Sequence, residues 1–152
     1  MKIKSFIVLS TLLSIFTRWC VADWPNQRGG SELQGISAEK LGDELVLEWT
    51  FEAGKFLKSS PVVSNGKIFL GGPTGIFYAL DSKTGQVVWK KETGLGVDAP
   101  ALVHNGKVYI GTKDGWLFCL DAESGKQNWT YETMGEIVGA PNPAIHPSTG
   151  RK

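Results

Sequence analysis

Residues that commonly carry enzymatic chemistry are few in this sequence and widely spaced. The two histidines, His104 and His146, have no i, i+4 partner and no cysteine nearby, and we expect both to be solvated turn residues rather than metal ligands. Cys119 lies within the apolar run 116–120 and is expected to be a small buried hydrophobe. The sequence contains no nucleophile elbow, phosphate-binding loop or dinucleotide-binding loop. It therefore predicts no catalytic, cofactor-binding or metal-binding residue.

Composition indicates which elements would have to position any site. Of the 152 residues, 19 are glycine and 6 are tryptophan, a balance typical of short strands joined by tight turns. With 16 Lys and Arg against 15 Asp and Glu, the chain has no positive excess for binding nucleic acid or an anionic membrane surface. Its 2 cysteines are too few for a disulfide scaffold or a Cys-rich zinc site.

Residues 1–22 have the order of parts of a secretory signal peptide. Lys2 and Lys4 precede an apolar stretch over 6–16, and small residues occupy positions 20 and 22. This stretch is too short for a typical membrane span. We therefore expect cleavage after Ala22 and a periplasmic or secreted mature chain with no membrane span.

A repeat of 40 residues organises most of the remaining chain. The segment NGKIFLG at 65–71 recurs as NGKVYIG at 105–111, and 11 of 30 residues are identical when 65–94 is aligned with 105–134. The tryptophans at positions 49, 89 and 129 follow the same spacing. A period of this length is typical of propeller blades and of helical HEAT-type repeats.

Turn chemistry favours strands over helices in each repeat. Each copy carries an Asn-Gly hairpin pair and two further glycine-containing turns, and this density of glycine would break helices. In the first copy we expect strands near 61–64, 67–71, 76–81 and 86–92, whose continuous apolar runs indicate cover on both faces. Four-stranded antiparallel sheets stacked face to face describe an all-β fold of β-propeller blades. An immunoglobulin-like sandwich is the alternative, although it would need no repeat of this period.

Both repeats resemble the tryptophan-docking motif of the pyrroloquinoline-quinone-like (PQQ-like) propeller family. The first copy reads Ala79-x-Asp81-x-x-x-Gly85-x-x-x-Trp89, and the second has Cys119 in the place of the alanine. The resemblance implies that each tryptophan lies flat between neighbouring blades, that each aspartate accepts hydrogen bonds from turn amides, and that each glycine adopts positive φ. The implied structural docking residues are Ala79, Asp81, Gly85, Trp89, Asp121, Gly125 and Trp129. The opening segment 23–29 also resembles the start of secreted family members.

The chain holds only part of such a propeller, because propellers usually have about four to eight blades and two full copies fit here. We expect a lead-in segment at 23–44, PQQ-like repeats over 45–146 and a truncated tail at 147–152. A leading strand at 45–51 and a trailing strand near 139–145 would flank the two blades of this incomplete propeller. We interpret the chain as the N-terminal piece of a longer protein, or as a truncated reading frame, with uncovered outer blade faces. The alternative is a genuine short protein that closes its propeller by oligomerising.

Three functions are compatible with these features. The first is an exported, non-catalytic binding or scaffolding module whose partners are cell-envelope proteins or further propeller blades. The second is part of a PQQ- and calcium-dependent alcohol or sugar dehydrogenase, for which the resemblance implies Ca²⁺ bound by oxygen ligands. Asp98, Asp114 and Asn142 lie near loops and could be recruited as such ligands. The third is the sensor domain of a larger secreted protein.

Overall fold

The computed structural model describes residues 23–30, 32–37, 40, 43–54 and 56–144. The expected signal peptide at 1–22, His146 and the tail at 147–152 lie outside the described residues. Every regular element formed by the described residues is a β-strand, as expected for the all-β fold. No described residue belongs to a helix with the length and apolar character that crossing a membrane requires.

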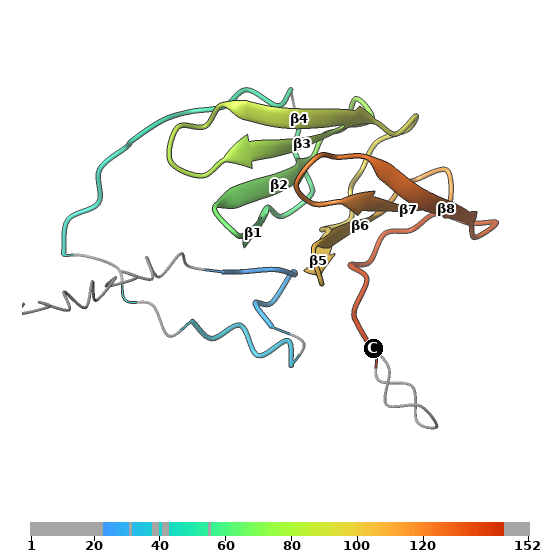
Figure 1. The fold of residues 1–152 in the computed structure, drawn as a ribbon, viewed down its shortest axis with the longest axis horizontal. Helices are drawn as coiled ribbons and strands as arrows, with labels where there is room; N and C mark the ends of the chain where they lie inside the picture. Colours follow the sequence, from blue (N-terminus) through green and yellow to red (C-terminus); the bar gives the residue numbers. More distant parts are fainter. Residues whose placement is uncertain (1–22, 31, 38–39, 41–42, 55, 145–152) are drawn as a thin grey trace, which may run out of the picture.

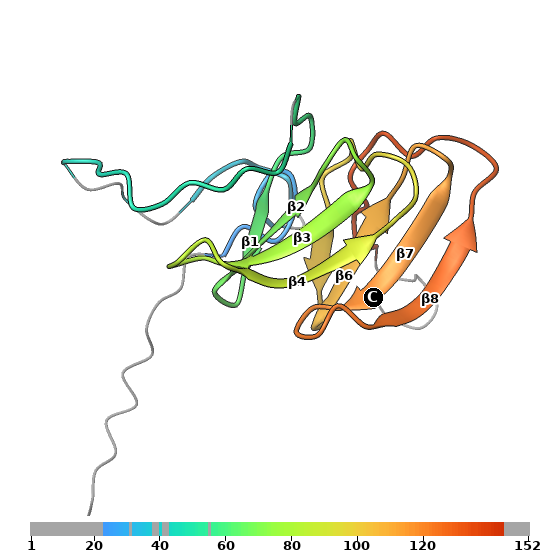
Figure 2. The ribbon, with the colours of Figure 1, turned by 90° about the horizontal axis from the view of Figure 1, so that it is seen from above.

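Two four-stranded antiparallel sheets form the fold, one from each repeat. The first sheet has the order β1 (Val62–Ser64), β2 (Lys67–Gly71), β3 (Ile76–Asp81) and β4 (Val87–Glu92). The second has the order β5 (Leu102–His104), β6 (Lys107–Gly111), β7 (Trp116–Asp121) and β8 (Gln127–Glu132). Figures 1 and 2 show the sheets stacked face to face, with β1 and β5 meeting at one edge. The prediction of two propeller blades is therefore confirmed.

Local chemistry explains why the strands begin and end where they do. Asn65 and Asn105 adopt φ of 49° and 50°, and the glycine that follows each of them also has positive φ. Two successive residues with positive φ make the tight turn whose twist matches that of the flanking strands. The register across the next hairpins is also shared, since Ala79 pairs with Trp89 and Cys119 pairs with Trp129.

The hydrophobic core lies between the two sheets. Phe77 and Trp89 from the first sheet, and Val108 and Ile110 from the second, are almost fully buried. An ion pair at the rim also joins the sheets, with Lys67 Nζ 2.6 Å from the Glu123 carboxylate. Stacking of the second sheet therefore buries one face of the first. The apolar residues on the opposite face of β2 and β3 are only partly buried, so the expected cover on both faces is incomplete.

The lead-in segment lies across the inner edge of both sheets, in blue in Figure 1. The backbone of Trp24 forms two hydrogen bonds with Val63 in β1, at 2.7 and 2.9 Å, and the Pro25 carbonyl accepts the Val103 amide of β5 at 2.7 Å. Asn26 is 1% exposed, and its amide donates to the Gly30 carbonyl. The segment thus satisfies backbone groups that an exposed sheet edge would leave unpaired.

The two expected flanking strands are not formed. Residues 45–51 and the described residues of 139–145 lie in no strand, and residue 145 falls outside the described part. A strand needs a neighbour to pair its backbone groups, and neither segment is hydrogen-bonded into either of the two described sheets. The side chains of Leu45, Val46 and Leu47 are 76–82% exposed.

Candidate functional site

Two tryptophans dock on glycines of the following sheet. Trp89 is 9% exposed, and its indole Nε1 donates to the Ala122 carbonyl at 3.1 Å. Its ring lies so close to Gly125 that a Cβ on this glycine would be 2.6 Å from Trp89 Cδ2. Trp49 repeats the arrangement one sheet earlier, with Nε1 3.1 Å from the Ser82 carbonyl and the ring against Gly85. Each indole therefore gains apolar cover and a partner for its N–H.

The aspartates organise the turns that present these glycines. Asp81 Oδ1 accepts hydrogen bonds from the Thr84 amide at 2.8 Å and the Thr84 hydroxyl at 2.9 Å. Asp121 Oδ1 accepts the same two bonds from Ser124, at 2.9 and 2.7 Å. The side-chain hydrogen bond is the largest cause that lowers the pKa of each carboxyl. Gly85 and Gly125 close the turns with φ of 70° and 71°, where residues with a Cβ are strained.

Ala79 and Cys119 occupy equivalent positions in the middle of β3 and β7. Both are fully buried, and Cys119 is a free thiol. Burial is the main cause that raises the pKa of the Cys119 thiol, so the thiol form is favoured over the reactive thiolate. A small residue here leaves room for the tryptophan that pairs with it on the next strand.

Trp129 differs from the expected docked geometry, because it is 43% exposed. Its ring packs on Tyr109 at 6.0 Å between centroids, but no described element covers the outer face of the second sheet. Tyr131, two residues further along β8, is also exposed, at 63%. A docking tryptophan is buried only by the following sheet, and the described residues form no third sheet.

His104 also departs from the expectation of a solvated turn residue. It is the last residue of β5, where the register pairs it with Lys107, and it is half-buried. Its Nε2 atom is buried and has no hydrogen-bond partner in the described part of the chain. The Asn-Gly turn is only two residues long, so its flanking residues remain in the strands.

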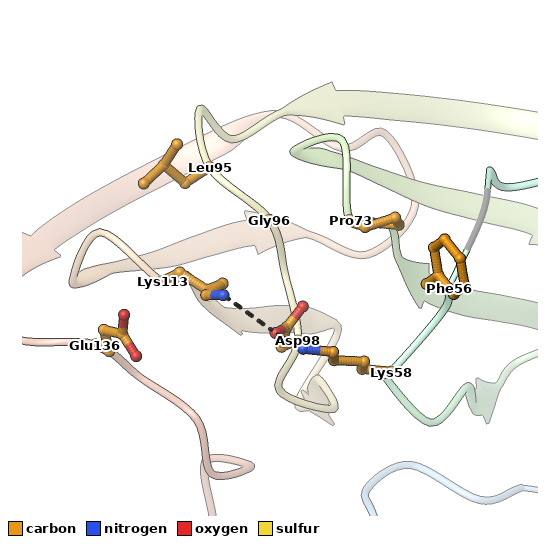
Figure 3. A pocket seen from close by; sticks show the side chains of 8 residues that line it. All are labelled: Phe56, Lys58, Pro73, Leu95, Gly96, Asp98, Lys113 and Glu136. Atoms are coloured by element: carbon orange, nitrogen blue, oxygen red, sulfur yellow. Dashed lines mark ion pairs between the residues drawn. The ribbon is translucent and has the colours of Figure 1, made fainter.

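A groove of about 450 Å³ opens at the end of the sheets opposite the Asn-Gly turns. Its lining comes from the turns at 72–75 and 112–115, from the connection at 93–99 between the sheets, and from segments that hold Phe56, Lys58 and Glu136. Asp98 lies in its centre, and Figure 3 shows Lys58 and Lys113 reaching it from opposite sides. Asp98 Oδ2 is 3.5 Å from Lys58 Nζ and 3.6 Å from Lys113 Nζ. The other lining residues are Phe56, Pro73, Leu95, Gly96 and Glu136.

The three candidate calcium ligands are engaged elsewhere and do not form one site. Asp98 faces two lysines, Asp114 accepts the Thr112 hydroxyl, and Asn142 accepts the Asn26 amide at 3.4 Å. No group of three acidic, histidine or cysteine side chains converges anywhere in the described ranges. The residues described here therefore do not fit a calcium ion, which prefers six to eight oxygen ligands.

The charged groove was not predicted from the sequence, where its lysines look like ordinary surface residues. One sequence signal could have indicated it. Lys113 takes the place that Pro73 holds in the first repeat, and Asp98 takes the place that Val138 holds in the next. Departures from an internal repeat mark residues that the shared fold does not require.

Four-stranded antiparallel sheets, stacked face to face and joined by docked tryptophans, define the class of the β-propellers. The sequence model of the family described as outer membrane protein assembly factor BamB matches residues 46–101 and 75–146. The chain belongs to this family of PQQ-like β-propeller repeats.

Known relatives agree with this assignment. Lupanine 17-hydroxylase (cytochrome c) of a Pseudomonas species is 39% identical over 74 residues, which are 44% of this chain and 11% of that protein. The crystal structure of BamB from Moraxella catarrhalis superposes with a TM-score of 0.52 and 31% identity, over 57% of this chain and 27% of that one. Quinohemoprotein alcohol dehydrogenase from Comamonas testosteroni gives a TM-score of 0.69 and 25% identity, over 80% of this chain and 22% of that one. The chain thus matches about a tenth of the length of lupanine 17-hydroxylase, the curated relative.

Proposed function

We propose that this chain is part of an exported propeller that acts as a non-catalytic binding or scaffolding module. The proposal rests on the hydrogen bonds that the aspartates and tryptophans of the repeated motif form. The Asp81 and Asp121 carboxylates are occupied by turn donors, and the Trp49 and Trp89 indoles donate to backbone carbonyls of the next sheet. The carboxylates therefore build turns and the indoles build sheet-to-sheet contacts, which gives both kinds of group a structural use.

The docking residues have a structural role under this proposal. Ala79, Asp81, Gly85, Trp89, Asp121 and Gly125 join neighbouring blades in the geometry described above. Trp129 follows the same 40-residue spacing and pairs with Cys119 as Trp89 pairs with Ala79, but no sheet formed by the described residues covers it. We propose that a further blade, or a partner protein of the cell envelope, covers this face.

The family description supports an envelope location. It names a factor for assembling outer-membrane proteins, and such a factor acts outside the cytoplasm. Segment 1–22 supplies the corresponding export signal in this proposal. The partners are then proteins of the same compartment.

A second candidate is part of a PQQ- and calcium-dependent alcohol or sugar dehydrogenase. The likeness to quinohemoprotein alcohol dehydrogenase from Comamonas testosteroni supports it, at 25% identity over 22% of that chain, against 31% identity with BamB from Moraxella catarrhalis. The described residues do not gather ligands for calcium, so this function would depend on residues outside them. PQQ would supply a redox centre for substrate oxidation when bound.

One experiment separates the two candidates. The protein produced from its complete gene is incubated with PQQ and Ca²⁺, and dye reduction is measured with alcohols and glucose. In parallel, envelope proteins are chemically crosslinked to it in intact cells and identified. We expect no turnover and a specific crosslinked envelope partner. Turnover that depends on added PQQ would overturn the scaffolding proposal.

A further inference from the structure

One turn of the second sheet, residues 121–125, receives two side chains from the first sheet. The ring of Trp89 lies on Gly125, and its Nε1 donates to a carbonyl of this turn at 3.1 Å. Lys67 Nζ lies 2.6 Å from the carboxylate of Glu123 in the same turn. The lysine side chain is only 13% exposed, although that of the glutamate is 81% exposed, so water screens this pair less than an ordinary surface pair. The turn therefore accepts an indole and an ammonium group together.

The outer face of the second sheet carries the same two donors. Trp129 and Lys107 follow Trp89 and Lys67 by 40 residues. Tyr109 contacts the Trp129 ring, and Lys107 lies on the same face because it is two residues from this tyrosine in β6. No carboxylate among the described residues forms an ion pair with Lys107. This face thus repeats the chemistry that the turn at 121–125 accepts.

The chain also leaves the second sheet in the way that it leaves the first. The Thr93 hydroxyl donates to the Gly75 carbonyl at 2.9 Å, and the Thr133 hydroxyl donates to the Gly115 carbonyl at 2.9 Å. In both connections the amide four residues after the threonine donates to the turn between the second and third strands, at 3.2 and 3.1 Å. The second sheet therefore has the exit geometry of a sheet that another sheet follows.

The first sheet of a second copy does not suit this face. Its corresponding turn, residues 81–85, has Lys83 in the place of Glu123. Packing two copies head to tail would bring this lysine to Lys107, and like charges that face each other across an interface are strongly unfavourable. The ring of Trp49 also already covers this turn. A sheet of the same repeat type fits only if its turn is uncovered and acidic.

We propose that Lys107 selects the sheet that docks on the outer face of the second sheet. The selected sheet is a further blade of a longer protein whose docking turn has an acidic residue two positions after its aspartate. This acidic residue pairs with Lys107, and the turn receives the Trp129 ring and its N–H. The same charge excludes the first sheet of a second copy. This inference rests on the proposed covering of Trp129 and names the chemistry of the covering sheet.

The turn of the first sheet can be converted into a probe for this face. Trp49→Ala uncovers the turn, and Lys83→Glu gives it the acidic residue of the second sheet. We expect Trp49→Ala/Lys83→Glu to associate head to tail about tenfold more tightly than Trp49→Ala in sedimentation equilibrium, because an opposite charge then meets Lys107. The unchanged chain should not associate through this face, and association that Trp129→Ala removes would overturn the exclusion of a second copy.

Matched charge changes keep this test specific. Adding Lys107→Glu to Trp49→Ala/Lys83→Glu should remove the gain, and Trp49→Ala/Lys107→Glu, which keeps Lys83, should regain it. Lys40→Glu makes the same charge change at an exposed residue outside both sheets and should leave the association of Trp49→Ala unchanged. An equal gain from Lys40→Glu would refute selection by charge, as would failure of the exchanged pair to associate. If circular dichroism shows that Lys107→Glu unfolds the chain, the comparison of Lys83→Glu with Lys40→Glu decides.

A photo-crosslinking residue identifies what covers the face. p-Benzoylphenylalanine replaces Tyr131, which is 63% exposed and lies two residues after Trp129 in β8, in the protein produced from its complete gene. We expect a crosslink within the same chain, to a turn with an acidic residue two positions after its aspartate. A crosslink to a second copy or to another protein, or the absence of any crosslink to such a turn, would overturn the proposal. PQQ-dependent turnover would instead refute the scaffolding function and leave this docking assignment standing.

Discussion

Adding one methyl group at Gly125 should show whether tryptophan docking holds the two sheets together. A Cβ at this position would be 2.6 Å from Trp89 Cδ2 and 2.7 Å from Trp89 Cε3, closer than van der Waals contact permits. Gly125 also has a φ of 71°, so alanine introduces backbone strain as well as a clash. The substitution Gly125→Ala therefore combines two destabilising effects.

Gly106→Ala separates these effects. Gly106 has a φ of 70°, and a Cβ there would meet no atom within 4 Å. Backbone strain alone should lower the free energy of unfolding by about 1–2 kcal/mol. Overpacking against a fixed ring adds about 1–3 kcal/mol, so Gly125→Ala should be destabilised by that further amount relative to Gly106→Ala.

Urea unfolding monitored by tryptophan fluorescence and by circular dichroism measures both variants. The difference between them should shrink when Trp89 is replaced by leucine, because the smaller side chain leaves space for the new methyl group. If Gly125→Ala is no less stable than Gly106→Ala, Trp89 is not held against this glycine and our account of the joined sheets is wrong.

Three further predictions concern the tryptophans, the turn carboxylates and the leader. Trp89→Ala should lower the free energy of unfolding by about 3–5 kcal/mol, whereas Trp129→Ala should have a much smaller effect in the same urea titration, because its ring is 43% exposed. The pKa values of Asp81 and Asp121 are lowered by folding, so their contribution to stability is present above the unfolded pKa near 3.8 and is lost as the pH falls further. Replacing both with asparagine should therefore lower the melting temperature at pH 7 more than at pH 3; an equal loss at both pH values would contradict this assignment. Edman sequencing of the exported protein should begin at Asp23, and a chain that retains Met1 would refute cleavage after Ala22.

Local chemistry made much of the fold predictable from sequence. The Asn-Gly pairs define tight hairpins through their own backbone preferences, and all four strands of the first blade lie within a residue of their expected bounds. The Asp81 turn is equally local, since its partner Thr84 is three residues away. Because matching turns recur every 40 residues, the sequence favoured stacked four-stranded sheets over other all-β architectures.

The tertiary structure decided which of the equivalent residues are buried and which groups meet. Trp89 and Trp129 have the same motif, but burial depends on whether another sheet covers the ring. Lys58, Asp98 and Lys113 belong to three separate loops, and only the stacking of the sheets brings their charges together. Turns and strands depend on neighbours along the chain. Burial of a tryptophan ring and the meeting of charged side chains depend instead on surfaces formed by residues that are distant in the sequence.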